Sequence, residues 1–194
     1  MRLLALADEP PAVDPARLAL ANHVDAVVIL GDLSADSIAS LADLEIPVLG
    51  VHGNHDDEGE FPALGVRDLH LSRVELEGWS FAGFEGCVRY REGAPYQYTQ
   101  GEAAKLARQL PPADVLLCHA PPRGVNDDPD DPAHVGFQAL RAWVLQHEPA
   151  YLLHGHTTPD PRTRVYRLGR TEVIWVRGAR IVELDRAKAL TGSS

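Results

Sequence analysis

Short apolar runs recur along this chain of 194 residues, and turn residues such as Gly, Pro, Asn and Asp bound them. Brief apolar runs with such boundaries are typical of buried β-strands. They predict strands over residues 2–7, 26–30, 48–51, 79–84, 114–118 and 151–154. Helical patterns between several of these runs cover residues 15–23, 36–44, 100–109 and 135–147. Ser34 is the predicted N-cap of the second helix, and Thr99 precedes the third. Strand and helix therefore alternate, which predicts a largely parallel central sheet.

The last part of the chain has a different pattern. Three strand-like runs, over residues 163–168, 171–176 and 179–184, are separated by turns that contain Gly. Closely spaced strands with such turns favour an antiparallel meander. We therefore predict a layered α/β sandwich with a mixed sheet component. A hydrophobic content of 45% suits one core, so residues 1–186 are predicted to form a single domain and residues 187–194 a C-terminal tail.

The net charge bears on the partners of the protein. Twenty-eight acidic and 18 basic side chains give a formal charge of −10, and such a surface repels phosphate-rich polymers at long range. Stable binding of duplex nucleic acid is therefore not expected. A small phosphorylated substrate remains compatible with this charge, because a bound divalent metal can reverse the local potential.

The sequence offers no candidate for a membrane segment or a disulfide framework. The apolar run at the start of the chain is too short for a signal-peptide core or a membrane span, and no later run reaches spanning length. Only Cys87 and Cys118 are present, and we interpret both as small core residues. We expect a cytoplasmic protein without a membrane partner, and the oligomeric state stays open.

Polar residues follow the predicted strands where open α/β sheets bind ligands, just beyond the carboxyl ends. They are Asp8, Gly31-Asp32, Gly53-Asn54-His55-Asp56, His119 and Gly155-His156. Carboxylate, amide and imidazole groups suit Mn, Fe and Zn ions, and glycines let the backbone turn tightly beside an ion. The pattern predicts a metal centre assembled from five loops. Each residue alone also has an ordinary alternative as a turn, loop or core residue.

Other polar residues have less specific interpretations. His52 and His154 are expected to be structural, because strand alternation turns them toward the core. The acidic, proline-rich segment 126–134 is interpreted as a solvated surface turn in preference to a ligand-binding loop, and His134 is assigned a capping or solvent role in preference to contact with substrate. Surface positions are expected for His23, His70 and His147.

The order of the polar groups resembles the calcineurin-like metallophosphoesterase family. The resemblance rests on Asp8, GD at 31–32, GNHD at 53–56, His119 within CHAPP and GH at 155–156, and it runs from residue 2 to about 184. It implies a four-layer αββα sandwich with mixed sheets. It also implies phosphoester hydrolysis by two adjacent divalent metals.

The resemblance further implies a role for each matching residue. One metal would be bound by Asp32, Asn54, His119 and His156. His55 would stand beside the phosphate as a general acid or as a hydrogen-bond donor, and Asp56 would fix the tautomer of His55.

Two departures from the family pattern affect the second metal. The family's first motif is Asp-x-His, but Pro10 stands here in place of the histidine. Its last motif is Gly-His-x-His, but Thr158 replaces the second histidine. The second site would keep only Asp8 and a shared Asp32, and strand alternation should point Glu9 away from Asp8. We therefore expect one well-occupied metal site and a second that is weak or absent.

The favoured hypothesis is a metal-dependent phosphoester hydrolase of low activity. Its substrate would be a small phosphomonoester or phosphodiester such as a nucleotide, and segments 85–99 and 121–134 would supply pocket walls. The alternative is a catalytically degenerate fold that serves as a binding module for a nucleotide or a protein. A stored or purely structural metal is a further alternative, in which stability would follow metal occupancy.

Overall fold

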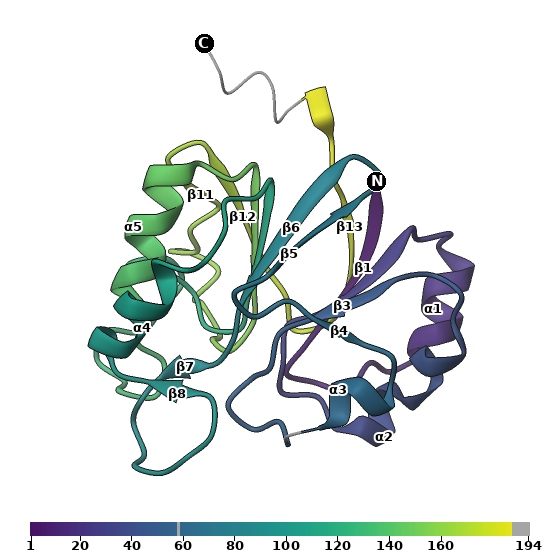
Figure 1. Ribbon diagram of the computed structural model, residues 1–194, viewed down its shortest axis with the longest axis horizontal. Helices are drawn as coiled ribbons and strands as arrows, with labels where there is room; N and C mark the ends of the chain where they lie inside the picture. The colour runs from purple at the N-terminus through teal and green to yellow at the C-terminus, as the bar shows by residue number, and fades with distance from the viewer. Residues whose placement is uncertain (58, 188–194) are drawn as a thin grey trace.

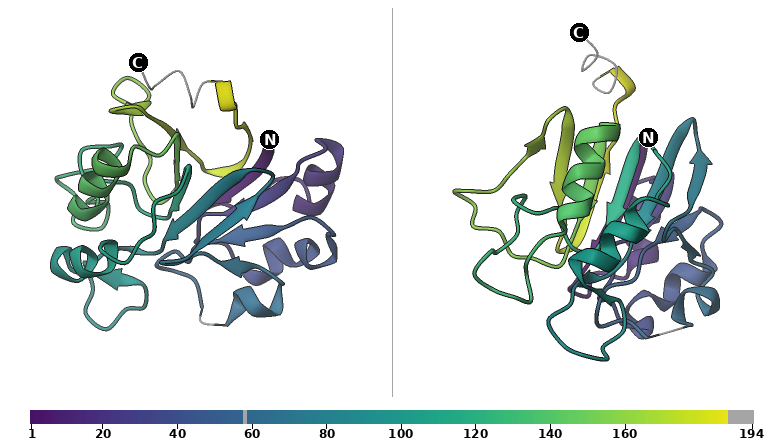
Figure 2. Two further views of the ribbon diagram at one scale, coloured as in Figure 1. Left: turned by 45° about the horizontal axis from the view of Figure 1, so that its top comes forward. Right: turned by 60° about the vertical axis from the view of Figure 1, so that its left-hand side comes forward.

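Two β-sheets pack face to face in the structure, and helices cover the outer face of each sheet (Figure 1). The computed structural model describes residues 1–57 and 59–187. One sheet has five strands in the order β13-β1-β2-β3-β4, and the other has six in the order β11-β12-β10-β9-β6-β5. Figure 2 shows the same layers from two further directions. The predicted αββα sandwich with mixed sheets is thereby confirmed.

The five-stranded sheet combines strands from both ends of the chain. They are β1 (Arg2–Ala7), β2 (Ala26–Ile29), β3 (Val48–Gly50), β4 (Arg67–Asp68) and β13 (Gly178–Glu183). The first four run parallel, and β13 runs antiparallel to β1. The helical segments beside this sheet are α1 (Pro15–Ala21), α2 (Ala35–Ile38), the 3-10 helix η1 (Ala39–Asp43) and α3 (Glu60–Ala63).

The six-stranded sheet has a parallel centre and antiparallel edges. Its strands are β5 (Arg73–Leu76), β6 (Trp79–Phe84), β9 (Val115–Cys118), β10 (Tyr151–His154), β11 (Arg167–Leu168) and β12 (Thr171–Trp175). Two helices cover it, α4 (Gln100–Ala107) and α5 (Gln138–His147). A separate two-stranded pair consists of β7 (Cys87–Val88) and β8 (Gln97–Tyr98).

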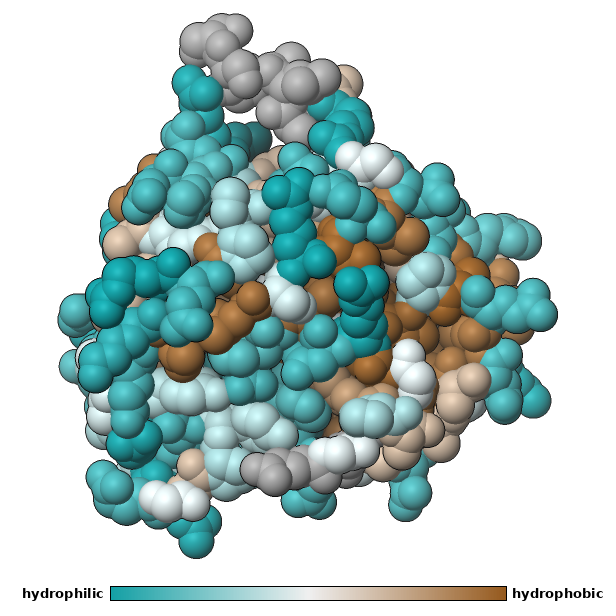
Figure 3. Space-filling view, in the orientation of Figure 1, coloured by the Kyte–Doolittle hydropathy of each residue, from teal (hydrophilic) through white to brown (hydrophobic). Residues whose placement is uncertain are grey.

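The central strands are buried on both faces, which explains their continuous apolar pattern. In β1, Leu3 and Ala5 pack between the two sheets, whereas Leu4 and Leu6 pack in the outer layer with α1. Full burial of each leucine contributes roughly 1.5–3 kcal/mol. Figure 3 shows that the hydrophobic residues visible on one face gather toward the right of the view, where the five-stranded sheet and its helices lie.

Three of the predicted helices have corrected boundaries or shapes. The segment predicted as one helix over 36–44 is divided into α2 and η1, and Ser34 is the N-cap of α2 without a side-chain capping bond. Helix α5 begins at residue 138 rather than 135, because the backbone of Phe137 is hydrogen-bonded to Pro121 and Arg123. Helix α1 ends at Ala21 rather than at residue 23.

Helix α4 starts where the sequence predicts it. The Thr99 hydroxyl accepts a hydrogen bond from the Glu102 backbone N–H, and the Glu102 carboxylate accepts one from the Thr99 N–H. This reciprocal capping box satisfies two N–H groups that the helix cannot pair internally. In the described parts of the chain, no helix is long and apolar enough to cross a membrane.

The predicted antiparallel meander at the end of the chain is wrong. β11 and β12 do form an antiparallel pair, but β12 then pairs in parallel with β10. The third run, β13, crosses to the other sheet and pairs with β1. There Val182 packs into the core between the sheets, and Leu184 follows it. The turn residues predicted a change of direction correctly, but they do not specify which sheet edge a strand joins.

Both cysteines are buried, as the sequence predicts. Burial raises the pKa of the Cys87 thiol to about 12. The thiol therefore stays protonated at neutral pH and packs as a small apolar group. Residues 188–194 of the predicted tail lie outside the described residues, and the domain boundary at residue 186 stays a prediction.

Candidate metal centre

Three strand ends with a predicted ligand carry a non-glycine residue in the left-handed backbone region, as do six other described residues, Glu77 after β5 among them. Asp8, Asp32 and His156 follow β1, β2 and β10 closely, with φ angles of 61°, 57° and 65°. Such a conformation costs an L-residue roughly 1–3 kcal/mol, and strained residues of this kind cluster at functional sites. The strain therefore occurs at the same strand ends that carry predicted metal ligands.

Two glycines allow the loops after β2 and β3 to touch. A Cβ atom added to Gly31 would lie 2.2 Å from the backbone nitrogen of Gly53, and one added to Gly53 would lie 2.1 Å from Oδ1 of Asp32. These distances are far shorter than a van der Waals contact, so only glycine fits at either position. The close approach directs Asp32 and Asn54 toward the same imidazole, that of His119.

Four predicted ligands converge between these loops. Asp32, His119 and His156 each present one ligand atom, and these atoms lie within 4.8 Å of one another. Nε2 of His119 also lies 3.1 Å from Oδ1 of Asn54 and 3.5 Å from Oδ2 of Asp32. One carboxylate, one amide oxygen and two imidazoles form a donor set that suits a divalent transition metal. We refer to these four residues as the metal centre.

Each imidazole of the metal centre is oriented by a backbone carbonyl. Nδ1 of His119 lies 2.7 Å from the carbonyl oxygen of Leu30, and Nε2 of His156 lies 2.7 Å from that of Ala133. A carbonyl oxygen only accepts hydrogen bonds, so both of these nitrogens must donate. Nε2 of His119 and Nδ1 of His156 therefore remain as the ligand atoms. Such anchoring through the second nitrogen is typical of metal-binding histidines.

The two oxygen ligands are oriented in the same manner. Oδ1 of Asp32 accepts the backbone N–H of His55 at 2.8 Å, which leaves Oδ2 directed toward His119. The amide nitrogen of Asn54 donates to the Tyr90 hydroxyl at 3.1 Å, which turns Oδ1 toward the same imidazole. Tyr90 belongs to segment 85–99, which the sequence predicts as a pocket wall. Nothing in the sequence indicates that Tyr90 contacts Asn54.

The charges of the metal centre are strongly coupled. Burial alone would raise the pKa of Asp32, but the neighbouring His119 lowers it to about 2. Burial alone would lower the pKa of His119, but Asp32 raises it to about 8. Burial lowers the pKa of His156 to about 3. In the metal-free protein at neutral pH, one proton on His119 balances the carboxylate of Asp32, at the place where a cation would bind.

Asp8 lies beside the metal centre but is engaged by the backbone. Its two carboxylate oxygens accept the backbone N–H of His156 at 2.9 and 3.0 Å. Burial raises the pKa of Asp8 to about 6. Glu9 is exposed and pairs with Arg177. In residues 1–57 and 59–187, the group around His119 is the only cluster of three such side chains that could hold a metal.

The two predicted catalytic residues have separate surroundings. The buried carboxylate of Asp56 accepts the backbone N–H groups of Leu33 and Gly53, at 3.1 and 2.7 Å. It thereby joins the two glycine-containing loops. His55 is exposed, and no hydrogen bond connects its ring to Asp56 in the part of the chain that the structure describes. Control of the His55 tautomer by Asp56 stays a prediction.

The acidic segment 126–134 packs against His154 of β10 at one end and against His156 of the metal centre at the other. Asn126 is buried and contacts Nε2 of His154 at 2.9 Å, and the ring of His134 lies 5.1 Å from the ring of His156. The middle of the segment is exposed, as a solvated turn would be, whereas its two ends pack against other parts of the protein. A cavity of about 380 Å³ opens here. Its lining consists of Asn126, Asp127, Asp128, His134, Thr157, Thr158, Pro159, Asp160 and Thr163.

Two other predictions about histidines are confirmed and one is wrong. His52 and His154 are buried, as strand alternation predicts. His70 is not a surface residue: its Nδ1 accepts the backbone N–H of Glu85, and burial lowers its pKa to about 4. His70 lies just before β5, and the local sequence pattern does not reveal how this turn packs. His23 is exposed and His147 is half-buried.

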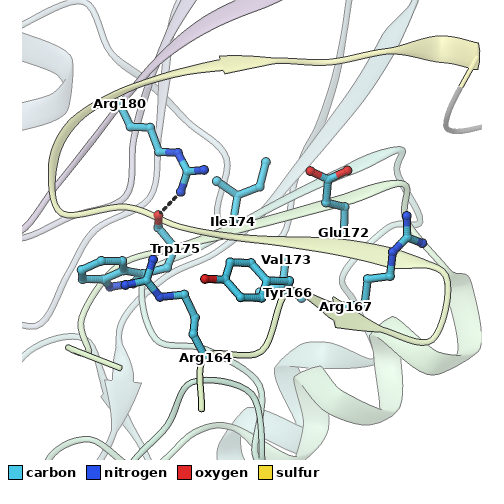
Figure 4. Close-up of a pocket in the computed structure, with 8 residues that line it drawn as sticks. All are labelled: Arg164, Tyr166, Arg167, Glu172, Val173, Ile174, Trp175 and Arg180. Atoms are coloured by element: carbon cyan, nitrogen blue, oxygen red, sulfur yellow. Dashed lines mark hydrogen bonds between the residues drawn. The ribbon is translucent and has the colours of Figure 1, made fainter. Parts of the chain in front are cut away.

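A further cavity, of about 450 Å³, lies away from the metal centre along β12 (Figure 4). The guanidinium of Arg164 lies 4.5 Å from the centre of the Trp175 ring, and Arg180 donates to the Trp175 carbonyl. The lining of this cavity contains none of the predicted site residues. The indole of Trp175 donates to the carbonyl of Thr157, which connects β12 to the loop after His156.

The fold and the site together define an αββα sandwich with a candidate metal-binding group on loops at the carboxyl ends of its strands. The model of the calcineurin-like phosphoesterases matches residues 11–160, and the chain belongs to this family. Members of the family are phosphoester hydrolases that use divalent metals and bind small phosphorylated substrates.

Solved structures show the same fold at low sequence identity. The protein TT1561 of Thermus thermophilus is 16% identical, with a TM-score of 0.64 over 91% of this chain and 89% of that one. A hypothetical protein from the same organism is 19% identical, with a TM-score of 0.51 over 90% of this chain and 75% of that one. A comparison with curated proteins found no match.

Proposed function

We propose that this chain is a metal-dependent phosphoester hydrolase that acts on a small phosphorylated molecule at the metal centre. One observation carries the proposal. Two imidazoles, each held by a backbone carbonyl, face the oxygens of Asp32 and Asn54 at one point. This donor set suits Mn, Fe or Zn. Phosphoester hydrolysis is the chemistry of the family to which the chain belongs.

The residues of the site have distinct tasks in this proposal. A divalent ion bound there would polarise a phosphoryl oxygen and lower the pKa of a water molecule. His55 is exposed, and its backbone N–H binds Asp32. We propose that its ring donates a proton or a hydrogen bond to the phosphoryl group or to the leaving group. Asp8 and Asp56 are positioning residues, because their carboxylates bind the backbone of loops that carry ligands.

The volume of the cavity beside His134 favours a small substrate. Its volume of about 380 Å³ is at the lower end of the range for small-molecule sites. A nucleotide is one candidate, and both phosphomonoesters and phosphodiesters fit the proposal. The cytoplasmic location stays a prediction from the sequence.

Metal content and hydrolysis, measured on the same preparations, test this proposal. We expect about one transition metal per chain, lost in His119→Ala and His156→Ala but kept in Asp8→Ala and in the control His147→Ala. With Mn, Fe or Zn added, hydrolysis of 4-nitrophenyl phosphate or its bis-ester should depend on His119. The absence of hydrolysis across a phosphoester panel would refute the enzymatic proposal. A nucleotide that raises Tm yet stays uncleaved would then favour the binding-module alternative.

A further inference from the structure

Arg177 connects the two segments in which the ligand motifs are interrupted. Its Nη2 lies 2.6 Å from Oε1 of Glu9, and its Nη1 donates to Oγ1 of Thr158 at 2.7 Å. Glu9 directly follows Asp8, and Thr158 lies two residues after His156. One guanidinium therefore joins the loop after β1 to the loop after β10, beside the metal centre.

The charge of Arg177 reaches into the site. Burial raises the pKa of Asp8, and Arg177 is one of the charged groups that oppose this rise, together with His119. Asp8 in turn holds the backbone of His156. The carboxylate of Asp8 thus interacts both with the charge of Arg177 and with the backbone of His156.

Arg177 retains donors for a further partner. A guanidinium has five N–H groups, and the two bonds to Glu9 and Thr158 occupy two of them. Its side chain is 39% exposed, so the remaining donors are accessible from solvent. An exposed ion pair such as Arg177 with Glu9 contributes little to stability and does not prevent the guanidinium from binding an anion.

The cavity beside His134 is lined by a hydrogen-bond partner of this guanidinium. Thr158, which accepts a hydrogen bond from Arg177, lines the cavity together with His134. The ring of His134 lies 5.1 Å from the ring of the metal ligand His156. A phosphorylated molecule in this cavity would therefore contact the hydrogen-bond acceptor of Arg177 and a histidine whose ring neighbours that of His156.

We propose that Arg177 binds a phosphoryl oxygen of the substrate and supplies a second positive charge beside a single metal ion. The inference rests on the proposed function. Charge that develops on a phosphoryl group is best stabilised by cations placed on more than one oxygen, and the described residues contain one metal-binding group. Arginine matches phosphate because its planar fork can donate two parallel hydrogen bonds. Glu9 and Thr158 act as positioning residues that direct the fork.

Phosphate binding and metal content, measured on metal-loaded protein, test the inference. In Arg177→Met, metal content should equal that of the wild type, whereas the affinity for inorganic phosphate in calorimetry should fall about ten- to hundredfold. Arg177→Lys keeps the charge but lacks the planar fork. Its phosphate affinity should therefore lie between that of the wild type and that of Arg177→Met. The matched control is Arg170→Met, because Arg170 lies in an exposed turn with only a 3.9 Å pairing to Glu148.

Each outcome decides between specific explanations. Phosphate affinity in Arg177→Met within about twofold of the wild type, or no larger a loss than in Arg170→Met, would overturn the inference. A loss of metal together with phosphate binding would also overturn it, because Arg177 would then only maintain the site. If the wild type hydrolyses phosphoesters and Arg177→Met is unaffected, only this inference fails. If the wild type binds no metal through His119, the proposed function fails and the inference fails with it.

Discussion

The proposed metal site predicts that protons and a metal ion compete for one nitrogen of His119. Nδ1 of this buried ring donates to the Leu30 carbonyl, so Nε2 is the atom that faces Asn54 and Asp32. Burial alone would lower the pKa of His119, but the adjacent Asp32 raises it to about 8. Nε2 therefore carries a proton in the metal-free protein at neutral pH, and metal binding must displace this proton.

The raised pKa of His119 predicts how strongly the metal affinity depends on pH. With a pKa of about 8, the neutral fraction of His119 falls from about one half at pH 8 to about 1% at pH 6. The apparent affinity for Mn²⁺ should therefore fall about fiftyfold over this range, which corresponds to about 2 kcal/mol. The pKa values of Asp32 and His156, about 2 and about 3, lie outside this range. Asp8, with a pKa of about 6, is the neighbour that also titrates.

Calorimetric titration with Mn²⁺ at pH 6, 7 and 8 measures this dependence. Buffers with different ionisation enthalpies report the protons released, and we expect about one per metal at pH 6. Asp8→Asn should keep most of the trend if His119 is the source of the proton. A change in affinity below about threefold between pH 6 and pH 8, or binding without proton release, would refute the reasoning.

The raised pKa of His119 also determines how the stability of the metal-free protein changes with pH. The pKa of His119 is raised above its ordinary value of 6.5, so its stabilisation is fully present below pH 6.5 and is lost as pH rises through about 8. Urea unfolding of metal-free protein should show a loss of about 2 kcal/mol from this group. Saturating metal should remove this dependence, because the ion replaces the proton.

Three further substitutions test how the metal centre is held in place. Asp56→Asn replaces one of two acceptors of buried backbone N–H groups, so the free energy of unfolding in urea should fall by about 1–3 kcal/mol. Gly53→Ala would place a Cβ atom 2.1 Å from a carboxylate oxygen, so metal content should be lost, whereas Gly101→Ala in α4 should stabilise the protein by about 0.5 kcal/mol. Tyr90→Phe removes the hydroxyl that orients Asn54, so Mn²⁺ affinity should fall about tenfold in calorimetry. Wild-type metal content in Gly53→Ala, or wild-type affinity in Tyr90→Phe, would contradict this account of the site.

Local pattern was sufficient to predict the elements that carry the site. Strands β1, β2, β3, β6, β9 and β10 lie within a residue of their predicted bounds. They are buried on both faces, so their apolar runs are continuous and end abruptly at turn residues. The candidate ligands stand just after these ends, and parallel strands bring such ends to one edge. For this reason Asp32, Asn54, His119 and His156 could be named among the candidate ligands, and the family resemblance then grouped these four around one metal.

Only the tertiary structure decided how the remaining parts meet. The sheet that β13 joins, the contact between segment 126–134 and His156, and the partners of Arg177 all connect residues far apart in the chain. The carbonyl oxygens of Leu30 and Ala133, which select the ligand nitrogens, have no sequence signal because every residue has such a group. Local pattern is read within a few residues, whereas these contacts depend on the packing of the whole chain. The sequence therefore determined which residues could bind a metal, and the packing of the two sheets determined their orientation and neighbours.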